Sequence, residues 1–350
     1  MSNLAENKLD LIDNSIKDIG DLLDDGLIIT NRSGFIVSAN DASREFLGKN
    51  LINQNITTFI KSKEFTNLVS KKFNENVDKE FFYQMDDVLK RSLSIRVKKL
   101  SNELIVILLL DMTLQRNLEK VRRDFVANVS HELRSPLTSL VGFIETLLSD
   151  NDIDQKSRQK FLNIMDEEAK RMNRLIDDIL SLSKVETEEH ITPSTSLSIL
   201  DPIKSVISSL DERGLSKNNK ISLINKSLDP AKPIYIIGNH DEITQVFTNL
   251  LENAIKYGYE NSEITVEVEK NKNKEITVII TNEGEGIPQK YLERLTERFF
   301  RVDKARSRKI GGTGLGLAIV KHILIRHRAT LSIDSELNKK TSITINFPSV

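Results

Sequence analysis

The sequence predicts a multidomain α+β protein built from three parts. Residues 20–112 alternate short strand-like runs with short helical segments, and residues 113–188 contain two long amphipathic helical stretches. Residues 203–350 alternate again and carry two clusters of glycines. A chain of 350 residues is long enough for two or three domains. We therefore expect a helical middle part between two α+β domains.

The composition is that of an ordinary water-soluble protein, with 29% charged and 39% hydrophobic residues. The 50 Lys and Arg residues are balanced by 51 Asp and Glu residues, which argues against a nucleic-acid binder. The absence of cysteine excludes disulfides, thiol catalysis and cysteine-based metal centres, and the 5 histidines lack metal-ligand spacing. The longest aliphatic run, Leu104 to Leu110, is far shorter than the ~20 residues of a membrane span. We expect a cytoplasmic chain without a transmembrane segment or signal peptide.

The first part has the pattern of a small domain of mixed strands and helices. Residues 1–19 are amphipathic and predict an N-terminal helix. Strands are expected near residues 27–30, 35–38, 81–84, 92–98 and 103–111, and helices near 42–47 and 63–71. This order, with Gly34, Ile36 and Asn40 in a Gly-x-Ile-x-x-x-Asn pattern, resembles a PAS domain. The resemblance implies a PAS-like α/β domain over residues 20–112; a generic α+β domain is the alternative.

The middle part, residues 113–188, is organised around the stretch DFVANVSHELRSPLTSLVGFIETLL, Asp124 to Leu148. Its apolar residues follow gaps of four and three, as in a helical bundle. On a helical wheel His131 lies about 200° from Leu133 and about 180° from Leu140, so we expect it to face solvent. A polar turn and a second amphipathic helix complete an αα-hairpin. Two exposed apolar seams favour a four-helix-bundle homodimer.

The segment FVANVSHELRSPL resembles the phosphoacceptor H-box of sensor histidine kinases. The resemblance implies that residues 113–188 form a dimerisation and histidine phosphotransfer domain in which His131 receives a phosphoryl group. We expect Glu132 to accept or hold the Nδ1 proton of that imidazole. Ser135 stands where relatives have Thr, and its hydroxyl would orient water for dephosphorylating a partner. Residues 189–202, rich in Ser, Thr and Pro, predict a linker.

The third part, residues 203–350, predicts an α+β domain with a mixed or antiparallel sheet. Helices are expected near residues 202–210, 241–257 and 315–328, and strands near 221–224, 234–237, 263–269, 275–281, 331–334 and 342–347. The glycine patterns fit neither a P-loop nor a Rossmann motif. The segment TNLLENAIKYG places Asn249, Asn253, Lys256 and Tyr257 on nearly one helical face. Amide oxygens suit Mg²⁺ and a lysine suits phosphate, although a plain solvated helix face would look similar.

Two glycine clusters follow that helix. The segment TNEGEGIP contains Gly284 and Gly286, which let the backbone approach a flat ligand closely. The segment GGTGLGLAIV carries Gly312, Gly314 and Gly316 at the start of an apolar helix, where free N–H groups can hold phosphate oxygens. The basic segment RFFRVDKARSRK lies between the two clusters, and we expect it to act as a lid.

In this order, the polar helix, the glycine clusters and the basic segment resemble the N, G1, F and G2 boxes of the Bergerat-type ATP-binding domain of histidine kinases and gyrase-like ATPases. The resemblance implies an α/β sandwich that binds ATP and Mg²⁺. It assigns Asn253 to Mg²⁺ and lines the nucleotide with Asn249, Lys256, Tyr257, Gly284, Gly286, Arg301, Gly312, Gly314 and Gly316. Asn282 stands where the family usually has the Asp that accepts from the adenine amino group. Its carboxamide oxygen can still accept, without charge assistance, so we expect weaker ATP binding.

These features predict a sensor histidine kinase that autophosphorylates His131 from Mg-ATP and passes the phosphoryl group to an Asp of a response-regulator receiver domain. Phosphatase activity toward that regulator is also expected. The chain is most similar to phosphate-regulon sensor kinases, which suggests phosphate-starvation signalling. Two alternatives remain open. One is a Bergerat ATPase or Ser/Thr kinase whose hairpin serves only dimerisation. The other is a binding scaffold without turnover, for which Asn282 is the support.

Overall fold

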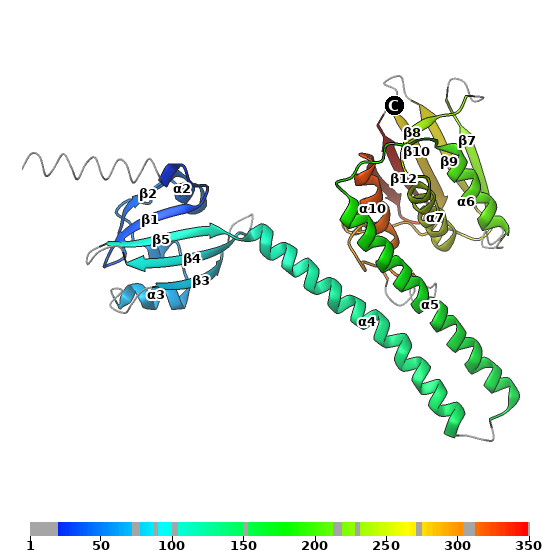
Figure 1. Ribbon diagram of the computed structural model, residues 1–350, viewed down its shortest axis with the longest axis horizontal. Coiled ribbons are helices and arrows are strands. Elements are labelled where there is room, and N and C mark those ends of the chain that lie inside the picture. Colours follow the sequence, from blue (N-terminus) through cyan, green and yellow to red (C-terminus); the bar gives the residue numbers. More distant parts are fainter. Residues whose placement is uncertain are drawn as a thin grey trace, which may run out of the picture. The chain divides into compact units, whose positions relative to one another are not determined.

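The computed structural model describes residues 20–71, 78–86, 90–99, 104–149, 153–212, 219–227, 232–270, 275–303 and 312–348. The chain divides into two compact units, Met1–Asp124 and Phe125–Val350 (Figure 1). The helix expected at residues 1–19 lies outside the described part. No described helix combines the length and the apolar character needed to cross a bilayer.

The first unit contains a five-stranded antiparallel sheet in the order β2-β1-β5-β4-β3. The strands are β1 (Gly26–Asn31), β2 (Ile36–Ala39), β3 (Asp78–Gln84), β4 (Ser92–Lys99) and β5 (Leu104–Asp111). The helices α2 (Asp41–Leu47), η1 (Ile56–Thr58) and α3 (Lys63–Ser70) connect β2 to β3. Their apolar side chains, among them Ile56, Phe65 and Leu68, share one core with the buried face of the sheet. The element order expected from the sequence is confirmed.

The three residues of the Gly-x-Ile-x-x-x-Asn pattern stabilise the fold of this unit. Gly34 has φ +83°, and a Cβ there would come within 2.5 Å of Val69. Ile36 is buried in the core. The buried Asn40 side chain accepts a hydrogen bond from the Leu27 N–H (2.8 Å) and donates one to the Gly20 carbonyl (2.7 Å). It also caps α2, which begins at the next residue. Fold stability alone accounts for these three residues.

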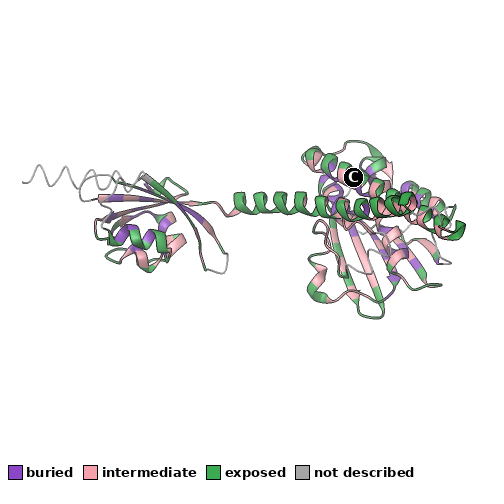
Figure 2. Ribbon diagram, turned by 90° about the horizontal axis from the view of Figure 1, so that it is seen from below, coloured by how far each residue is buried: buried purple, intermediate pink, exposed green. Residues whose placement is uncertain are grey.

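Two long helices form a hairpin, α4 (Thr113–Ser149) and α5 (Gln155–Glu188). Asp154 caps α5 by accepting from the Ser157 N–H at 2.9 Å. The rings of Phe143 and Phe161 pack across the hairpin with centroids 5.2 Å apart. Figure 2 shows α4 exposed along most of its length, and among its residues Pro136 is buried. The apolar stripe is therefore largely uncovered in a single chain.

The rest of the second unit is a two-layer α/β sandwich. Its mixed sheet has the order β11-β12-β10-β9-β7, in which β7 and β9 are parallel and the other pairs antiparallel. The strands are β7 (Lys220–Asn225), β9 (Glu263–Lys270), β10 (Ile276–Glu283), β11 (Thr330–Glu336) and β12 (Lys340–Phe347). The helices α6 (Leu200–Glu212), α7 (His240–Tyr257) and α10 (Gly316–Arg326) form the other layer (Figure 1). A short helix, α8 (Gln289–Leu292), follows β10. The expected α+β pattern with a mixed sheet is confirmed.

The expected linker at residues 189–202 needs correction. Ser196–Ser198 form β6, which pairs antiparallel with β8 (Tyr235–Ile237), and α6 already begins at Leu200. Ile199 is completely buried in the core of the sandwich. A three-residue strand is too short to show a period in the sequence, whereas the surrounding Ser, Thr and Pro residues indicate a loop. The segment therefore belongs to the sandwich.

Candidate functional site

His131 lies near the middle of α4 and is exposed, as the helical arithmetic predicts. Ser135 and Arg134 are exposed beside it. The seam on the other side of the helix is partly open in one chain: Leu137 is 51% and Ile144 43% exposed. Apolar side chains this exposed at bundle spacing are suited to a second hairpin.

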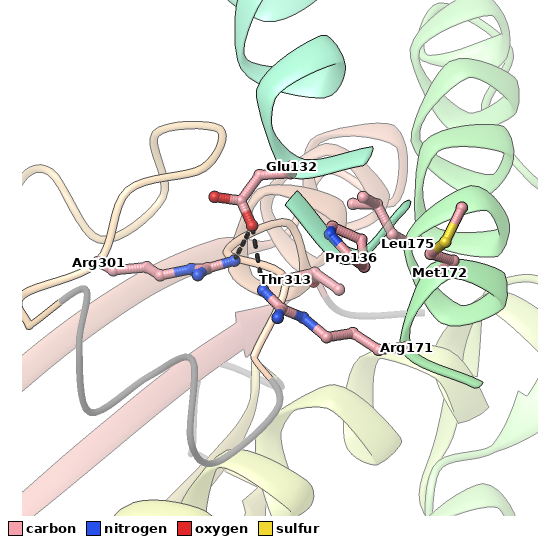
Figure 3. Close-up of a pocket in the computed structure, with 7 residues that line it drawn as sticks. All are labelled: Glu132, Pro136, Arg171, Met172, Leu175, Arg301 and Thr313. Atoms are coloured by element: carbon pink, nitrogen blue, oxygen red, sulfur yellow. Dashed lines mark hydrogen bonds and ion pairs between the residues drawn. The ribbon is translucent and has the colours of Figure 1, made fainter. Parts of the chain in front are cut away.

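Glu132, next to His131, faces the α/β sandwich. Its Oε2 atom lies 3.3 Å from Nη2 of Arg171 on α5 and 3.3 Å from Nη2 of Arg301, which lies between α8 and α10 (Figure 3). The Arg301 side chain is 5% exposed, and its buried Nε has no hydrogen-bond partner among the described residues. The carboxylate is thus held by two guanidinium groups. This arrangement differs from the expected pairing with His131.

A cavity of about 10 Å³ lies beside this carboxylate, roughly the space of one water molecule. It is lined by Glu132, Pro136, Arg171, Met172, Leu175, Arg301 and Thr313 (Figure 3). The cavity is far too small for a nucleotide. It marks the contact between the hairpin and the sandwich.

The polar face of α7 meets both glycine clusters. A Cβ on Gly316, the first residue of α10, would lie 3.1 Å from Oδ1 of Asn249. Gly284 and Gly258 form an isolated bridge, and a Cβ on Gly284 would lie 2.5 Å from the Tyr257 carbonyl oxygen. Two residues of α7, Asn249 and Tyr257, therefore lie next to one glycine from each glycine cluster. Lys256, on the same helix, pairs with Glu252 at 3.0 Å.

The first glycine cluster, Gly284 and Gly286, follows β10. Asn282 is buried near the end of that strand, and its amide Nδ2 donates to the Glu283 carbonyl at 3.3 Å. Gly286 has φ +70°, and a Cβ there would collide with the Glu336 carbonyl group. Backbone geometry thus requires glycine at position 286 whatever ligand binds. The contacts of Gly286 are with the β11–β12 turn, away from α7.

The second glycine cluster, which contains Gly312, Gly314 and Gly316, lies against the segment that contains Arg301. Gly314 has φ +77°, and a Cβ there would lie 3.0 Å from Cα of Phe299 and 3.2 Å from Nε of Arg301. The Phe299 N–H donates to the Gly314 carbonyl at 2.8 Å. Gly312 lies in a loop next to Thr313. The polar face of α7, the two glycine clusters and Arg301 are therefore linked through direct neighbours. Asn253 is half-buried on α7, one helical turn beyond Asn249.

Three residues on the hairpin side of this site were missed by sequence reasoning. Besides Arg171, Asp178 of α5 accepts a hydrogen bond from Oγ1 of Thr313 at 2.6 Å. Ser181 of α5 exchanges hydrogen bonds with Gln245 of α7 at 2.8 and 3.1 Å. A signal for the first two exists: Arg171 and Asp178 share the helical face of the buried Leu175, Leu182 and Val185. Polar residues within a buried stripe point to a specific partner.

The carboxyl end of α5 is held by a second group of contacts. Arg326 of α10 donates from Nε to the Ile191 carbonyl (2.8 Å) and forms ion pairs with Glu188 (2.9 Å) and Glu242. His322 lies 2.7 Å from a Glu189 oxygen. Burial raises the pKa of Glu242, although the Arg326 charge opposes this. Two charged side chains, each 10% exposed, are thus paired at the base of the sandwich.

Two family models match the chain. Residues 121–188 match the His Kinase A (phospho-acceptor) domain, and residues 238–350 match the histidine kinase-, DNA gyrase B-, and HSP90-like ATPase domain. The chain is 33% identical over 332 residues to the sensor histidine kinase WalK of Bacillus subtilis, covering 93% of this chain and 53% of WalK. It is 33% identical over 350 residues to the phosphate regulon sensor protein PhoR of Pseudomonas aeruginosa, covering 98% and 76%. The chain thus spans about half of that WalK and three quarters of PhoR.

A solved structure has a similar fold over most of the chain. It is the crystal structure of histidine kinase ThkA in complex with the response regulator protein TrrA, with a TM-score of 0.52 and 22% sequence identity. The likeness covers 93% of this chain and 96% of ThkA. At this identity the likeness concerns the fold.

Proposed function

Because this chain belongs to the sensor histidine kinase family, we propose that His131 is its phosphoacceptor and that the sandwich holds the phosphoryl donor. The observation that supports this most is the position of Glu132. The residue after an exposed histidine contacts Arg301, which itself adjoins the glycine at position 314. The phosphoacceptor helix and the proposed phosphate-binding loop are therefore neighbours.

The donor is ATP with Mg²⁺, and the residues present fit both. Glycines at positions 284, 314 and 316 let neighbouring segments approach closely, because a Cβ at each position would press on another residue. The described residues contain no group of three or more His, Asp or Glu side chains able to hold a metal by themselves. A Mg²⁺ ion would be held mainly by phosphates and water, with the amide oxygen of Asn253 as a protein ligand, and it would neutralise phosphate charge.

The remaining assignments follow the same plan. Asn249, Lys256 and Tyr257 line the nucleotide on α7, and Asn282 accepts from the adenine amino group. Gly284 and Gly286 approach the base, and Gly312, Gly314 and Gly316 approach the phosphates. The buried Nε of Arg301 is a free donor for the γ-phosphate among the described atoms. Such a donor is costly to leave unpaired, which favours an anionic ligand.

In the reaction, the neutral imidazole of His131 forms an N–P bond to the γ-phosphorus while the bond to the oxygen of the leaving ADP breaks. The imidazole must lose its other proton, and Glu132 is the nearest carboxylate in the sequence. To serve as that base, Glu132 has to exchange Arg171 and Arg301 for His131.

The test is phosphate labelling from ATP in the purified chain. We expect acid-labile, base-stable label that disappears in His131→Gln and persists in His240→Gln, a change at another exposed histidine. Acid-stable label, or ATP hydrolysis unaffected by His131→Gln, would instead indicate the Ser/Thr kinase or ATPase alternative. Failure of the wild-type protein to bind ATP would indicate a scaffold.

The second step transfers the phosphoryl group to an Asp of a response-regulator receiver domain. Ser135 is exposed one helical turn beyond His131, and its proposed role is to orient a water molecule that hydrolyses the phosphorylated Asp of the regulator. Ser135→Ala should spare autophosphorylation and slow dephosphorylation of the phosphorylated regulator. Loss of both activities would contradict this role. The similarity to PhoR supports a regulator of phosphate starvation.

The first unit is proposed as a PAS-like sensor domain, supported by its paired strands, small helices and closing antiparallel strands.

The exposed seam of α4 and α5 supports a homodimer through a four-helix bundle. Analytical ultracentrifugation of wild type and of Ile144→Asp tests the dimer. The variant should be monomeric, and an unchanged dimer would place the interface elsewhere.

A further inference from the structure

A carboxylate of the hairpin contacts the glycine loop proposed to hold the ATP phosphates. Thr313, between Gly312 and Gly314, donates its hydroxyl proton to Oδ2 of Asp178 at 2.6 Å. The same hydroxyl oxygen accepts a hydrogen bond from the Leu315 N–H at 3.3 Å. Asp178 therefore contacts a loop whose backbone is shaped by a glycine at φ +77°.

Asp178 is partly buried, and its neighbours act on its charge in opposite directions. Burial raises the pKa of its carboxyl, and the Thr313 hydrogen bond and the charge of Lys256 oppose that rise. The charges of Glu252 and Asp177 add to it. The two groups that favour the carboxylate, Thr313 and Lys256, both belong to the proposed nucleotide site. A phosphate oxygen is an anionic acceptor that would seek the same groups.

We propose that Asp178 competes with the phosphates of ATP for this loop, so that docking of α5 on the sandwich and nucleotide binding weaken each other. The inference rests on the proposed function, since it takes residues 312–316 as the phosphate-binding loop. Coupling between two binding events is reciprocal, so nucleotide must loosen the hairpin by the same factor that the hairpin weakens nucleotide. ATP would thereby free the sandwich from the hairpin before His131 is reached.

The same face of α5 contains the other contacts that docking would lose. Leu175 and Leu182 are buried there, and Ser181 bonds to Gln245 on α7. These contacts carry no net charge, so an arriving anion does not repel them. Arg171 on the same face is a cation paired with Glu132, whereas Asp178 is a carboxylate, which the charge of an arriving nucleotide would repel.

The experiment measures nucleotide affinity in the full chain. Mg·AMP-PNP, which cannot transfer its phosphoryl group, is titrated calorimetrically into wild type, Asp178→Asn and Asp177→Asn. Asparagine keeps an acceptor oxygen for Thr313 and removes the charge. Asp177→Asn is the matched control, because Asp177 is the exposed neighbour on the same helix. We expect Asp178→Asn to bind at least about fivefold more tightly, at the low end of usual coupling factors, and the control to bind as wild type.

A second readout distinguishes competition from a general change in stability. In wild type, Mg·AMP-PNP should speed hydrogen exchange at the amides of residues 171–188 of α5, and this effect should shrink in Asp178→Asn. Equal or weaker nucleotide binding in Asp178→Asn, or equal tightening in the control, overturns the inference while leaving the ATP site intact. No binding by any of the three proteins would overturn the proposed nucleotide site itself, and this inference with it.

Discussion

The sandwich holds α5 at two places that differ in kind. The loop contact consists of Glu132, Arg171, Asp178, Arg301 and Thr313, beside the proposed phosphate site. The helix-end contact joins the end of α5 to the sandwich. It consists of Glu186, Glu188 and the C-cap residue Glu189 on one side, and Arg298, His322 and Arg326 on the other. In the loop contact, hairpin carboxylates contact groups that a nucleotide would also use. In the helix-end contact, no member is assigned to the nucleotide.

The difference indicates which contact opens. When a ligand binds to a group that already forms an ion pair or hydrogen bond, the ligand replaces that contact. A contact whose groups bind no ligand persists. We therefore interpret the helix-end contact as the pivot about which the sandwich moves, and the loop contact as the part that separates. Both contacts involve α5, so the order in which they break decides how the sandwich reaches His131.

The largest effect is expected from Arg326→Met, which removes the central cation of the helix-end contact. It leaves the Glu242 carboxylate, 10% exposed, without its buried partner. Breaking such a pair from one side costs about 3–5 kcal/mol, so the free energy of unfolding of the second unit should fall by that amount. Urea denaturation followed by far-UV circular dichroism measures it.

The double variant Arg326→Met with Glu242→Leu is the control for that loss. Because an apolar pair can replace a buried ion pair at little cost, most of the stability should return. If the single variant lost less than about 1 kcal/mol of unfolding free energy, water would already hydrate the Glu242 carboxylate. The helix-end contact would then be a weak pivot.

A medium effect is expected from Gly314→Ala in the loop contact. Alanine is strained at φ +77°, and its Cβ would press on the Phe299 backbone at 3.0 Å. The cost is about 1–3 kcal/mol, together with weaker Mg·AMP-PNP binding. Gly142→Ala is the comparison, since no atom lies within 4 Å of a Cβ there and the site is inside α4; it should stabilise by about 0.5–1 kcal/mol. Equal responses of the two variants would show that the loop is not strained.

The smallest effect concerns pH and His327, beside the helix-end contact. Its Nε2 accepts from the Asn239 N–H at 3.0 Å, and its Nδ1 faces the Ile323 carbonyl at 2.7 Å, an arrangement suited to the neutral ring. Burial lowers the pKa of this imidazole below its ordinary value. The unfolded chain therefore takes up the proton first as pH falls below about 6.5, and stability is lost down to the lower folded pKa.

Wild type should consequently lose more stability than His327→Gln between pH 7.5 and 5.5, measured by thermal unfolding. Glu242 and Arg326 face the ring as well, and Glu242, whose pKa is raised by burial, works in the opposite direction. Because both proteins contain Glu242, its contribution cancels in the comparison. Parallel pH profiles would show that His327 does not titrate in this range.

Elements with a long apolar period were predictable, and short or shared ones were not. The stripe of α7 and the alternation of β9 and β10 arise from burial against one sheet, so a local window of sequence contains the whole signal. The strand β6 is three residues long and pairs with β8 nearly forty residues away, so no window contains both. The predicted linker was wrong for that reason.

The site divides in the same way. Sequence by itself determined the exposed direction of His131 and the polar face of α7, because both follow from helical geometry. Tertiary structure alone decided that Glu132 faces Arg301 and that Asp178 reaches Thr313, since these partners lie 169 and 135 residues apart. Their pairing depends on how one helix lies against the sandwich, and the free energy of that docking is shared among many side chains.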